Sequence, residues 1–279
     1  MKRKVISQVK GHSVVDGAGV NLVRVLGNRT VEIFDPILML DSFDSTDPKD
    51  YIAGFPTHPH RGIETISYLV KGKMTHRDSL GSKDTITDGE VQWMTAGSGI
   101  MHSEELPASD RILGVQLWLN LPQKDKMVAP EYKAIKKEQI KNINIENGEL
   151  RLLAGKYKNI EGFKSNYLPL NYYDIQLNAN SKFTLDVDEN SSIMLFTLLG
   201  KIEIDDKIVE EKTAIKLSLG NSVEFLTKEK SARILFIESH SLNEPVSWGG
   251  PIVMNSRSEL EKAFKDLENG TFLKDKIKY

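Results

Sequence analysis

The sequence has no cysteine among its 279 residues. This absence excludes disulfide bonds and thiolate ligands, so any bound metal ion must be held by nitrogen and oxygen atoms. A chain without disulfides is compatible with a reducing compartment, and we expect a cytoplasmic protein. The basic start at residues 1–4 is followed by only two apolar residues, Val5 and Ile6, which are too few for the apolar core of a signal peptide.

Long hydrophobic runs are also missing. The longest apolar stretches, residues 36–40 and 193–199, fall far short of the roughly 20 residues that a membrane span needs. The formal net charge is −2 and basic residues are spread along the chain, so nucleic acid and anionic membranes are not expected as partners. With 39% hydrophobic and 27% charged residues, the composition is that of a globular protein, and the length suits two compact domains.

Short runs with strand character dominate what is present. Turn sequences that contain Gly, Asp or Asn separate them, and this pattern predicts an all-β fold of sandwiches or barrels. The polar segment 124–147 is interpreted as the connection between two halves. The predicted strands lie at residues 20–26, 65–70, 91–95, 114–119, 193–199, 214–217, 223–226 and 232–237.

One amphipathic helix is predicted near the C-terminus. Residues from Ser256 to Glu259 have the form of a capping box, in which each of these two side chains bonds to the backbone of the other residue. Gly270 is suited to end the helix. Between these signals, apolar residues recur at helical spacing: Leu260, Ala263, Phe264 and Leu267.

The two halves of the chain also resemble each other weakly. Residues 66–73 resemble residues 194–201 at an offset of 128, and residues 88–93 resemble residues 219–225 at an offset of 131. Together with the strand pattern, these similarities indicate a duplicated β-domain.

Histidine is rare, with six in the chain, yet three fall in two short pairs. His58 and His60 form one pair, and His102 forms another with Glu104. Residues i and i+2 of a strand point to the same face, so two such strands within one barrel could direct four ligands at one point. Either pair alone would more often be structural, but both halves of a site are present. Three imidazoles and a carboxylate suit Fe, Mn, Ni, Cu, Co or Zn rather than Ca or Mg.

The sequence around these pairs resembles the pirin family of the cupin superfamily. Residues 54–65, GFPTHPHRGIET, resemble the first pirin signature, and residues 92–104, QWMTAGSGIMHSE, resemble the second. Further matches lie at residues 16–20, 35–41, 116–122 and 250–255, so the resemblance spans almost the whole chain.

This resemblance implies a bicupin, with two tandem jelly-roll-like β-barrels and a C-terminal α-helix. Residues 1–130 would form a metal-binding cupin domain, and residues 131–279 a metal-free cupin domain that carries the helix. One divalent transition metal per chain is implied, first iron(II), with Ni, Cu, Mn, Co or Zn as alternatives. Its ligands would be the residues that match those of the family: His58, His60, His102 and Glu104.

The second half lacks such a ligand set. Shifting the first pair by 128 residues leads to Asp186 and Asp188, and shifting His102 by 131 leads to Arg233, which cannot ligate a metal. We therefore expect both aspartates to face solvent on a strand and the second barrel to hold no metal.

The carboxylate ligand has two candidates. Archetypal cupins take their glutamate from the first motif, and Glu64 fits that spacing, whereas pirins use the glutamate that matches Glu104. We favour Glu104 and expect Glu64, near the start of its strand, either to be structural or to support the metal ligands from outside. His76 is predicted to be an ordinary polar strand residue, and His12 and His240 have no motif partner.

The pirin resemblance implies a dioxygenase that opens a flavonol such as quercetin with O₂ and releases carbon monoxide. Glu104 would take the proton of the flavonol hydroxyl group. The alternative is a non-catalytic regulator of transcription or metabolism that acts through protein contacts that depend on the metal or its redox state. A purely structural metal is the least favoured interpretation. Phe55, Met94 and Met101 would either line an entrance for an aromatic substrate or belong to the core.

Overall fold

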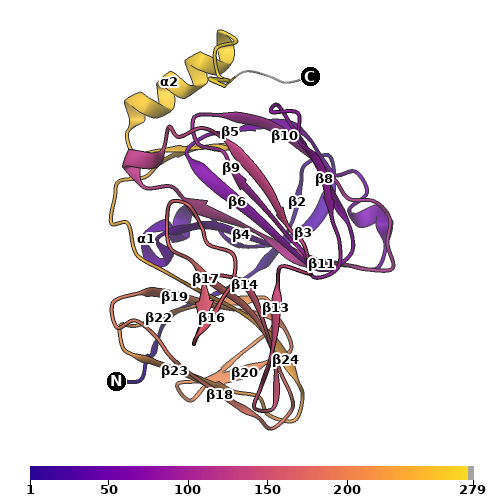
Figure 1. Cartoon of the computed structure of the whole chain (residues 1–279), viewed down its shortest axis with the longest axis vertical. Helices are drawn as coiled ribbons and strands as arrows, with labels where there is room; N and C mark the ends of the chain where they lie inside the picture. The colour runs from indigo at the N-terminus through magenta and orange to yellow at the C-terminus, as the bar shows by residue number, and fades with distance from the viewer. Residues whose placement is uncertain (276–279) are drawn as a thin grey trace. The chain divides into compact units, whose positions relative to one another are not determined.

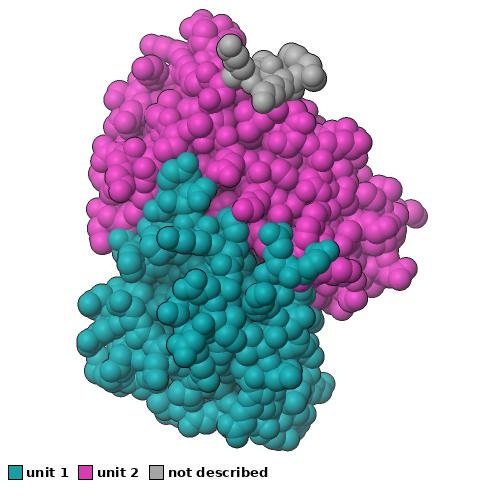
Figure 2. Space-filling model, viewed as in Figure 1, with its two compact units in different colours: residues 1–12, 32–36, 138–241 teal, residues 13–31, 37–137, 242–279 magenta. Residues whose placement is uncertain are grey.

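The computed structural model describes residues 1–275, which form short antiparallel strands and few helices (Figure 1). The chain divides into two compact units, coloured separately in Figure 2. Unit 1 consists of residues 1–12, 32–36 and 138–241, and unit 2 consists of residues 13–31, 37–137 and those from 242 onward. Within the described part of the chain, no helix is long and apolar enough to cross a membrane.

Unit 2 contains a seven-stranded sheet and a four-stranded sheet. The order of the larger sheet is β12-β9-β6-β11-β4-β3-β2, and that of the smaller sheet is β5-β10-β7-β8. In chain order, the strands are β2 (His12–Asp16), β3 (Val20–Leu26), β4 (Ile37–Ser45), β5 (Phe55–His60), β6 (Ile63–Lys71), β7 (Met74–Asp78), β8 (Lys83–Ile86), β9 (Val91–Thr95), β10 (Ile100–Glu105), β11 (Ile112–Asn120) and β12 (Glu131–Ile135).

Short helical segments and a terminal hairpin accompany these sheets. They are η1 (Asn28–Thr30), α1 (Val31–Phe34, whose last three residues fall in unit 1), η2 (Pro48–Asp50), η3 (Gln123–Asp125), the hairpin of β25 (Ser247–Gly249) and β26 (Ile252–Met254), and α2 (Arg257–Glu268).

Unit 1 repeats the same two-sheet plan. Its larger sheet has the order β1-β22-β19-β24-β17-β14-β13, and its smaller sheet has the order β18-β23-β20-β21. The strands are β1 (Val5–Lys10), β13 (Lys141–Ile145), β14 (Gly148–Ala154), β17 (Asn171–Leu177), β18 (Lys182–Asp186), β19 (Ser192–Leu199), β20 (Ile202–Ile204), β21 (Lys207–Val209), β22 (Thr213–Leu217), β23 (Ser222–Leu226) and β24 (Ala232–Ser239), with a separate hairpin of β15 (Lys156–Tyr157) and β16 (Ile160–Glu161). Its core is a cluster of buried aliphatic and aromatic residues from both sheets.

The two sheet orders show which strands correspond. β6 corresponds to β19, as the offset of 128 predicted, and β5, β10 and β7 correspond to β18, β23 and β20. The offset of 131 was wrong, because it aligned β9 with β23, whereas the sheet position of β9 is that of β22. The counterpart of the strand that carries His102 is therefore β23 and not the strand that carries Arg233. Neither β18 nor β23 contains a histidine.

The units differ from the predicted division at residues 130 and 131. The central boundary lies between residues 137 and 138, residues 32–36 belong to unit 1, and each terminal segment belongs to the other unit than predicted. β1 belongs to unit 1 because its backbone pairs with β22, from Val5 opposite Leu217 to Lys10 opposite Thr213. The segment from residue 242, including α2, belongs to unit 2. The expected connection 124–147 also contributes strands, since β12 pairs with β9 and β13 pairs with β14.

The predicted C-terminal helix is confirmed as α2. Ser256 caps it and forms the capping box with Glu259, whose side chain accepts the N–H of Ser256 at 2.8 Å. Gly270 follows the helix with φ +67°, the left-handed conformation that favours glycine after a helix end. Ala263 is buried in a cluster with Ile252 of the β25–β26 hairpin. This burial explains why α2 belongs to unit 2.

Candidate metal centre

Two neighbouring strands of the smaller sheet of unit 2 carry the predicted ligand pairs. β5 and β10 are antiparallel, and His58 lies opposite His102 in their register. Along β10, buried residues alternate with more exposed ones, so His102 and Glu104 are both directed inward. The strand period thus places one ligand pair beside the other, as the sequence predicts.

The structure brings three of the four predicted ligands together. His58, His60 and His102 each offer a ring nitrogen, and these atoms lie within 4.8 Å of one another. His60 and His102 are buried, with 2% and 1% of their surfaces exposed. Burial, followed by the neighbouring His58, lowers the pKa of His60 to about 3, and burial also lowers the pKa of His102 well below its usual range. Both buried rings are therefore held neutral near pH 7.

The hydrogen bonds of the rings show which nitrogens are free. Nδ1 of His58 donates to the carbonyl oxygen of Pro56 at 2.8 Å, and Nδ1 of His60 donates to that of Pro251 at 3.0 Å. In a neutral ring this leaves Nε2 without a proton. The two Nε2 atoms nevertheless lie 3.0 Å apart, and Nε2 of His102 is buried without a hydrogen-bond partner.

Three ring nitrogens that converge in this way fit a bound cation. Two imidazole nitrogens bound to one metal at about 2.1 Å, at right angles, lie about 3 Å apart, which matches the distance between His58 and His60. Without a cation, their lone pairs would face each other and repel. The three histidines thus fit the transition metal that the sequence predicts.

Glu104 lies outside this three-histidine cluster. Its carboxylate is 2% exposed and accepts hydrogen bonds from two glutamine amides. Nε2 of Gln92 donates to Oε1 at 2.7 Å, and Nε2 of Gln116 donates to Oε1 at 3.1 Å and to Oε2 at 2.9 Å. The role of Glu104 as the fourth ligand therefore stays a prediction.

Glu64 is also outside the cluster and holds other side chains. Its Oε1 accepts hydrogen bonds from Nε1 of Trp93 at 3.0 Å and from Oγ1 of Thr95 at 2.7 Å. Burial raises the pKa of this carboxyl group above its usual range. The chain does bend at Gly62, with φ +79°, and a Cβ there would lie 2.0 Å from the carbonyl oxygen of Val253. Even with this bend, Glu64 is bonded to Trp93 and Thr95.

His76 lies on a strand, β7, as predicted, but it is not an ordinary polar residue of that strand. Its side chain is fully buried, and its Nδ1 lies 3.4 Å from Nδ1 of His102. Its Nε2 donates to Oδ2 of Asp78 at 2.8 Å. The spacing of His76 and Asp78, two residues apart on β7, was a signal of the same kind as the two ligand pairs.

Comparisons with known proteins agree with the motifs of the site. The Pirin family model matches residues 19–119, and the model of the Pirin C-terminal cupin domain matches residues 172–273. A pirin-like protein of Caulobacter vibrioides is 38% identical over 278 residues, covering 97% of this chain and 99% of that protein. The chain belongs to the pirin family.

Other pirins and a solved structure support the same fold. Human pirin is 34% identical over 274 residues, covering 96% of this chain and 93% of that protein. A crystal structure titled quercetin 2,3-dioxygenase from Acinetobacter baumannii is 32% identical, with a TM-score of 0.89 and coverage of 98% of this chain and 99% of that one. The predicted bicupin fold is therefore confirmed for this pirin.

A cavity of about 700 Å³ in unit 2 of this pirin includes the metal site in its wall. His58, His60 and Gln116 line it, which places two of the three imidazoles beside open space. Its volume lies in the usual range for small-molecule sites. Phe55 lines the cavity, which agrees with the prediction of an entrance for an aromatic substrate. Met94 belongs to the buried core, which was the alternative prediction. The other lining residues include Asp16, Arg24, Met39, Asp41, Trp118 and Trp248.

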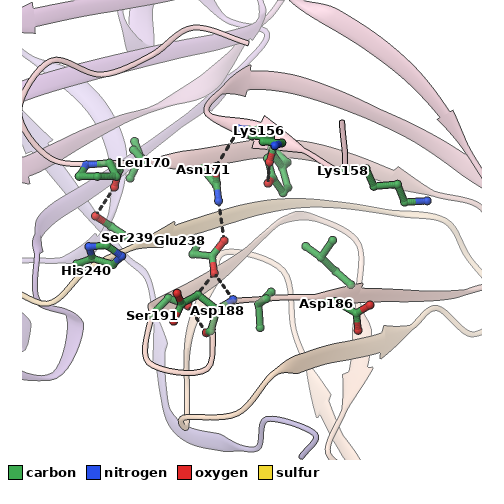
Figure 3. Close-up of a pocket in the computed structure, with 14 residues that line it drawn as sticks. Lys156, Lys158, Leu170, Asn171, Asp186, Asp188, Ser191, Glu238, Ser239 and His240 are labelled. Atoms are coloured by element: carbon green, nitrogen blue, oxygen red, sulfur yellow. Dashed lines mark hydrogen bonds between the residues drawn. The ribbon is translucent and has the colours of Figure 1, made fainter. Parts of the chain in front are cut away.

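Unit 1 has a cavity of its own, of about 480 Å³, which Figure 3 shows. Its buried carboxylate, Glu238, is already bonded: Asn171 and Ser191 donate to it at 2.7 Å each. Asp186 and Asp188 line the same cavity and are exposed, as predicted, but only Asp186 lies on a strand, since β18 ends at that residue. The charged groups of this cavity therefore do not form a cluster like the three histidines.

Proposed function

We propose that this pirin is a metal-dependent dioxygenase that acts on a flavonol such as quercetin with O₂. The observation that carries the proposal is the convergence of three imidazole nitrogens, from His58, His60 and His102, beside a cavity with aromatic walls. The similarity to the Acinetobacter baumannii structure titled quercetin 2,3-dioxygenase supports the same activity.

His58, His60, His102 and Glu104 would hold the metal ion, with iron(II) as the first choice. Nitrogen and oxygen donors of this kind bind several divalent transition metals, so Ni, Cu, Mn, Co and Zn stay alternatives. Four protein ligands leave positions open on a six-coordinate ion, and a bound ion of this kind supplies Lewis acidity and, for iron, redox chemistry toward O₂. The neutral state of the buried imidazoles keeps them available as ligands.

The cavity walls suit a flat aromatic substrate. The indole rings of Trp118 and Trp248 lie 5.7 Å apart, centroid to centroid, and Phe55 adds a third aromatic ring to the wall. Polar side chains offer partners for the hydroxyl groups of a polyphenol. Asp41 accepts two hydrogen bonds from Arg24, at 2.9 and 2.7 Å, which holds both side chains in the wall.

Glu104 would act as the proton acceptor for the flavonol hydroxyl group. Gln116 lines the cavity and bonds to both oxygens of this carboxylate, so it joins Glu104 to the wall of the substrate site. A carboxylate beside the metal could accept the hydroxyl proton as the substrate binds.

The test loads the protein with iron(II) under anaerobic conditions and then measures turnover after quercetin and O₂ are added. Quercetin and O₂ should disappear together, with carbon monoxide released in equal amount, and His102→Ala should abolish this reaction. Metal-loaded protein that consumes no quercetin would refute the dioxygenase and favour the regulatory alternative, in which the same site acts through protein contacts.

A further inference from the structure

A second buried pair, His76 and Asp78, contacts the metal site from β7. β7 pairs with β10, and His102 lies opposite Asp78 in their register. The side chains of both His76 and Asp78 are completely buried. The ring of Tyr132 stacks on that of His76 with centroids 4.0 Å apart and an interplanar angle of 11°. The imidazole of His76 is thus held on one face and at both nitrogens.

The orientation of Asp78 is set by the backbone that follows it. Its Oδ1 accepts the N–H groups of Leu80 at 2.9 Å and of Ser82 at 3.0 Å. Its Oδ2 therefore faces Nε2 of His76 at 2.8 Å. A carboxylate can only accept here, so when the ring of His76 is neutral its proton lies on Nε2 and its Nδ1 carries none.

The same reasoning continues to His102. Its Nδ1 lies 3.4 Å from the unprotonated Nδ1 of His76, so a hydrogen bond there requires His102 to be the donor. With its proton on Nδ1, the neutral ring of His102 has a bare Nε2. This is the buried nitrogen that has no hydrogen-bond partner among residues 1–275.

We propose that His76, oriented by Asp78, is a positioning residue that keeps His102 in the tautomer whose Nε2 binds the metal. His58 and His60 obtain the same tautomer from main-chain carbonyl groups, which substitutions do not remove. His102 depends on side chains instead. The inference rests on the proposed function in one respect, namely that Nε2 of His102 is a metal ligand. Loss of an outer partner of a ligating histidine typically lowers metal affinity about 10–100-fold.

Asp78→Asn tests the inference because it should move the proton from one ring nitrogen to the other in both His76 and His102. The N–H groups of Leu80 and Ser82 would retain the carbonyl oxygen of the asparagine, which places its NH₂ group against Nε2 of His76. His76 would then carry its proton on Nδ1 and donate it to His102, whose own proton would move to Nε2. An equivalent change of tautomer by replacement of an orienting aspartate with asparagine costs a serine protease about 10⁴-fold in turnover number.

Asp88→Asn is the matched control. Its carboxylate also holds a turn, accepting the N–H of Gly72 at 2.8 Å, and it pairs with Lys71 at 2.7 Å. Asp88 is exposed and its hydrogen bonds go to Lys71 and Gly72, so this variant reports the cost of removing a turn carboxylate alone.

Two substitutions of His76 keep the test independent of how Asp78→Asn folds. His76→Gln retains an acceptor for His102 and a donor for Asp78, so it should bind metal more tightly than His76→Phe, which retains only the ring stacked on Tyr132. The expected order of affinity is wild type, then His76→Gln, then His76→Phe, with the last about 10–100-fold below wild type.

Two readouts separate this inference from the proposed activity. Competition with a chelator gives the affinity for Ni²⁺ or Zn²⁺ without any turnover, and ¹H–¹⁵N NMR of the imidazoles in metal-free protein shows which nitrogen of His102 bears the proton. We expect the proton on Nδ1 in wild type and in Asp88→Asn, and on Nε2 in Asp78→Asn.

Equal metal affinities of Asp78→Asn and Asp88→Asn, or an unchanged tautomer, would overturn the inference. Wild-type protein that binds metal but does not consume quercetin would refute the dioxygenase and leave the inference standing.

Discussion

Glu104→Gln changes the predicted carboxylate ligand with almost no change in volume. In the wild type, both carboxylate oxygens accept hydrogen bonds from the amides of Gln92 and Gln116. A glutamine at position 104 has one oxygen, so its NH₂ group would face the NH₂ group of Gln116 in the orientation that this amide has in the wild type. One buried, unsatisfied donor costs about 1–3 kcal/mol of unfolding free energy.

The effect on the metal should be larger than the effect on stability. The substitution removes a negative charge beside the dication, and we expect metal affinity to fall by at least the factor of about 10–100 that follows loss of an outer ligand partner. It also removes the proposed proton acceptor. Turnover per bound ion should therefore fall further, by about 10²–10⁴, the usual contribution of a general base.

Glu64→Gln is the control, because it makes the same change at another buried carboxylate. The glutamine oxygen can keep the bonds from Trp93 and Thr95, while its NH₂ group takes the place of Oε2, which is buried without a hydrogen-bond partner. We again expect a loss of about 1–3 kcal/mol of stability. Metal content and turnover per ion should stay at the wild-type level.

The assay combines elemental analysis of metal per chain, quercetin consumption per bound metal, and urea unfolding of all three proteins. The reasoning is refuted if Glu104→Gln keeps wild-type turnover per ion while Glu64→Gln abolishes it. That result would show that the site follows the archetypal cupin pattern.

Three further predictions follow from the site and its surroundings. His58→Ala combined with His102→Ala should lose stoichiometric metal in elemental analysis, because the remaining donors compete poorly with water. Asp186→Ala and Asp188→Ala should leave the metal content at one ion per chain, and a second ion that either change removes would contradict a metal-free second barrel. Hydrogen bonds from Lys274 and Arg61 lower the pKa of Asp266 to about 2, below its ordinary 3.8, so its stabilising effect is present above about pH 4 and lost as the pH falls toward 2. Urea unfolding should find Asp266→Asn less stable than wild type at pH 7, with a difference that shrinks between pH 4 and pH 2.

The strand pattern was predictable because it depends on local periodicity. Each predicted strand, from residues 20–26 to residues 232–237, lies within an observed one, and the cap at Ser256 and the glycine at position 270 delimit α2. Two-residue spacing was also enough to place His58 beside His60 and His102 beside Glu104 on common strand faces.

The sequence alone therefore determined the alternation of buried and exposed residues, the helix ends and the three histidines of the site, since each depends on neighbours a few positions away. Only the tertiary structure decided which segments from distant parts of the chain complete that site. The carbonyl oxygen of Pro251 holds His60 across 191 positions, and His76 meets His102 across 26. Such contacts leave no periodic trace, because they depend on strand register and on the burial of groups that must find hydrogen-bond partners away from water.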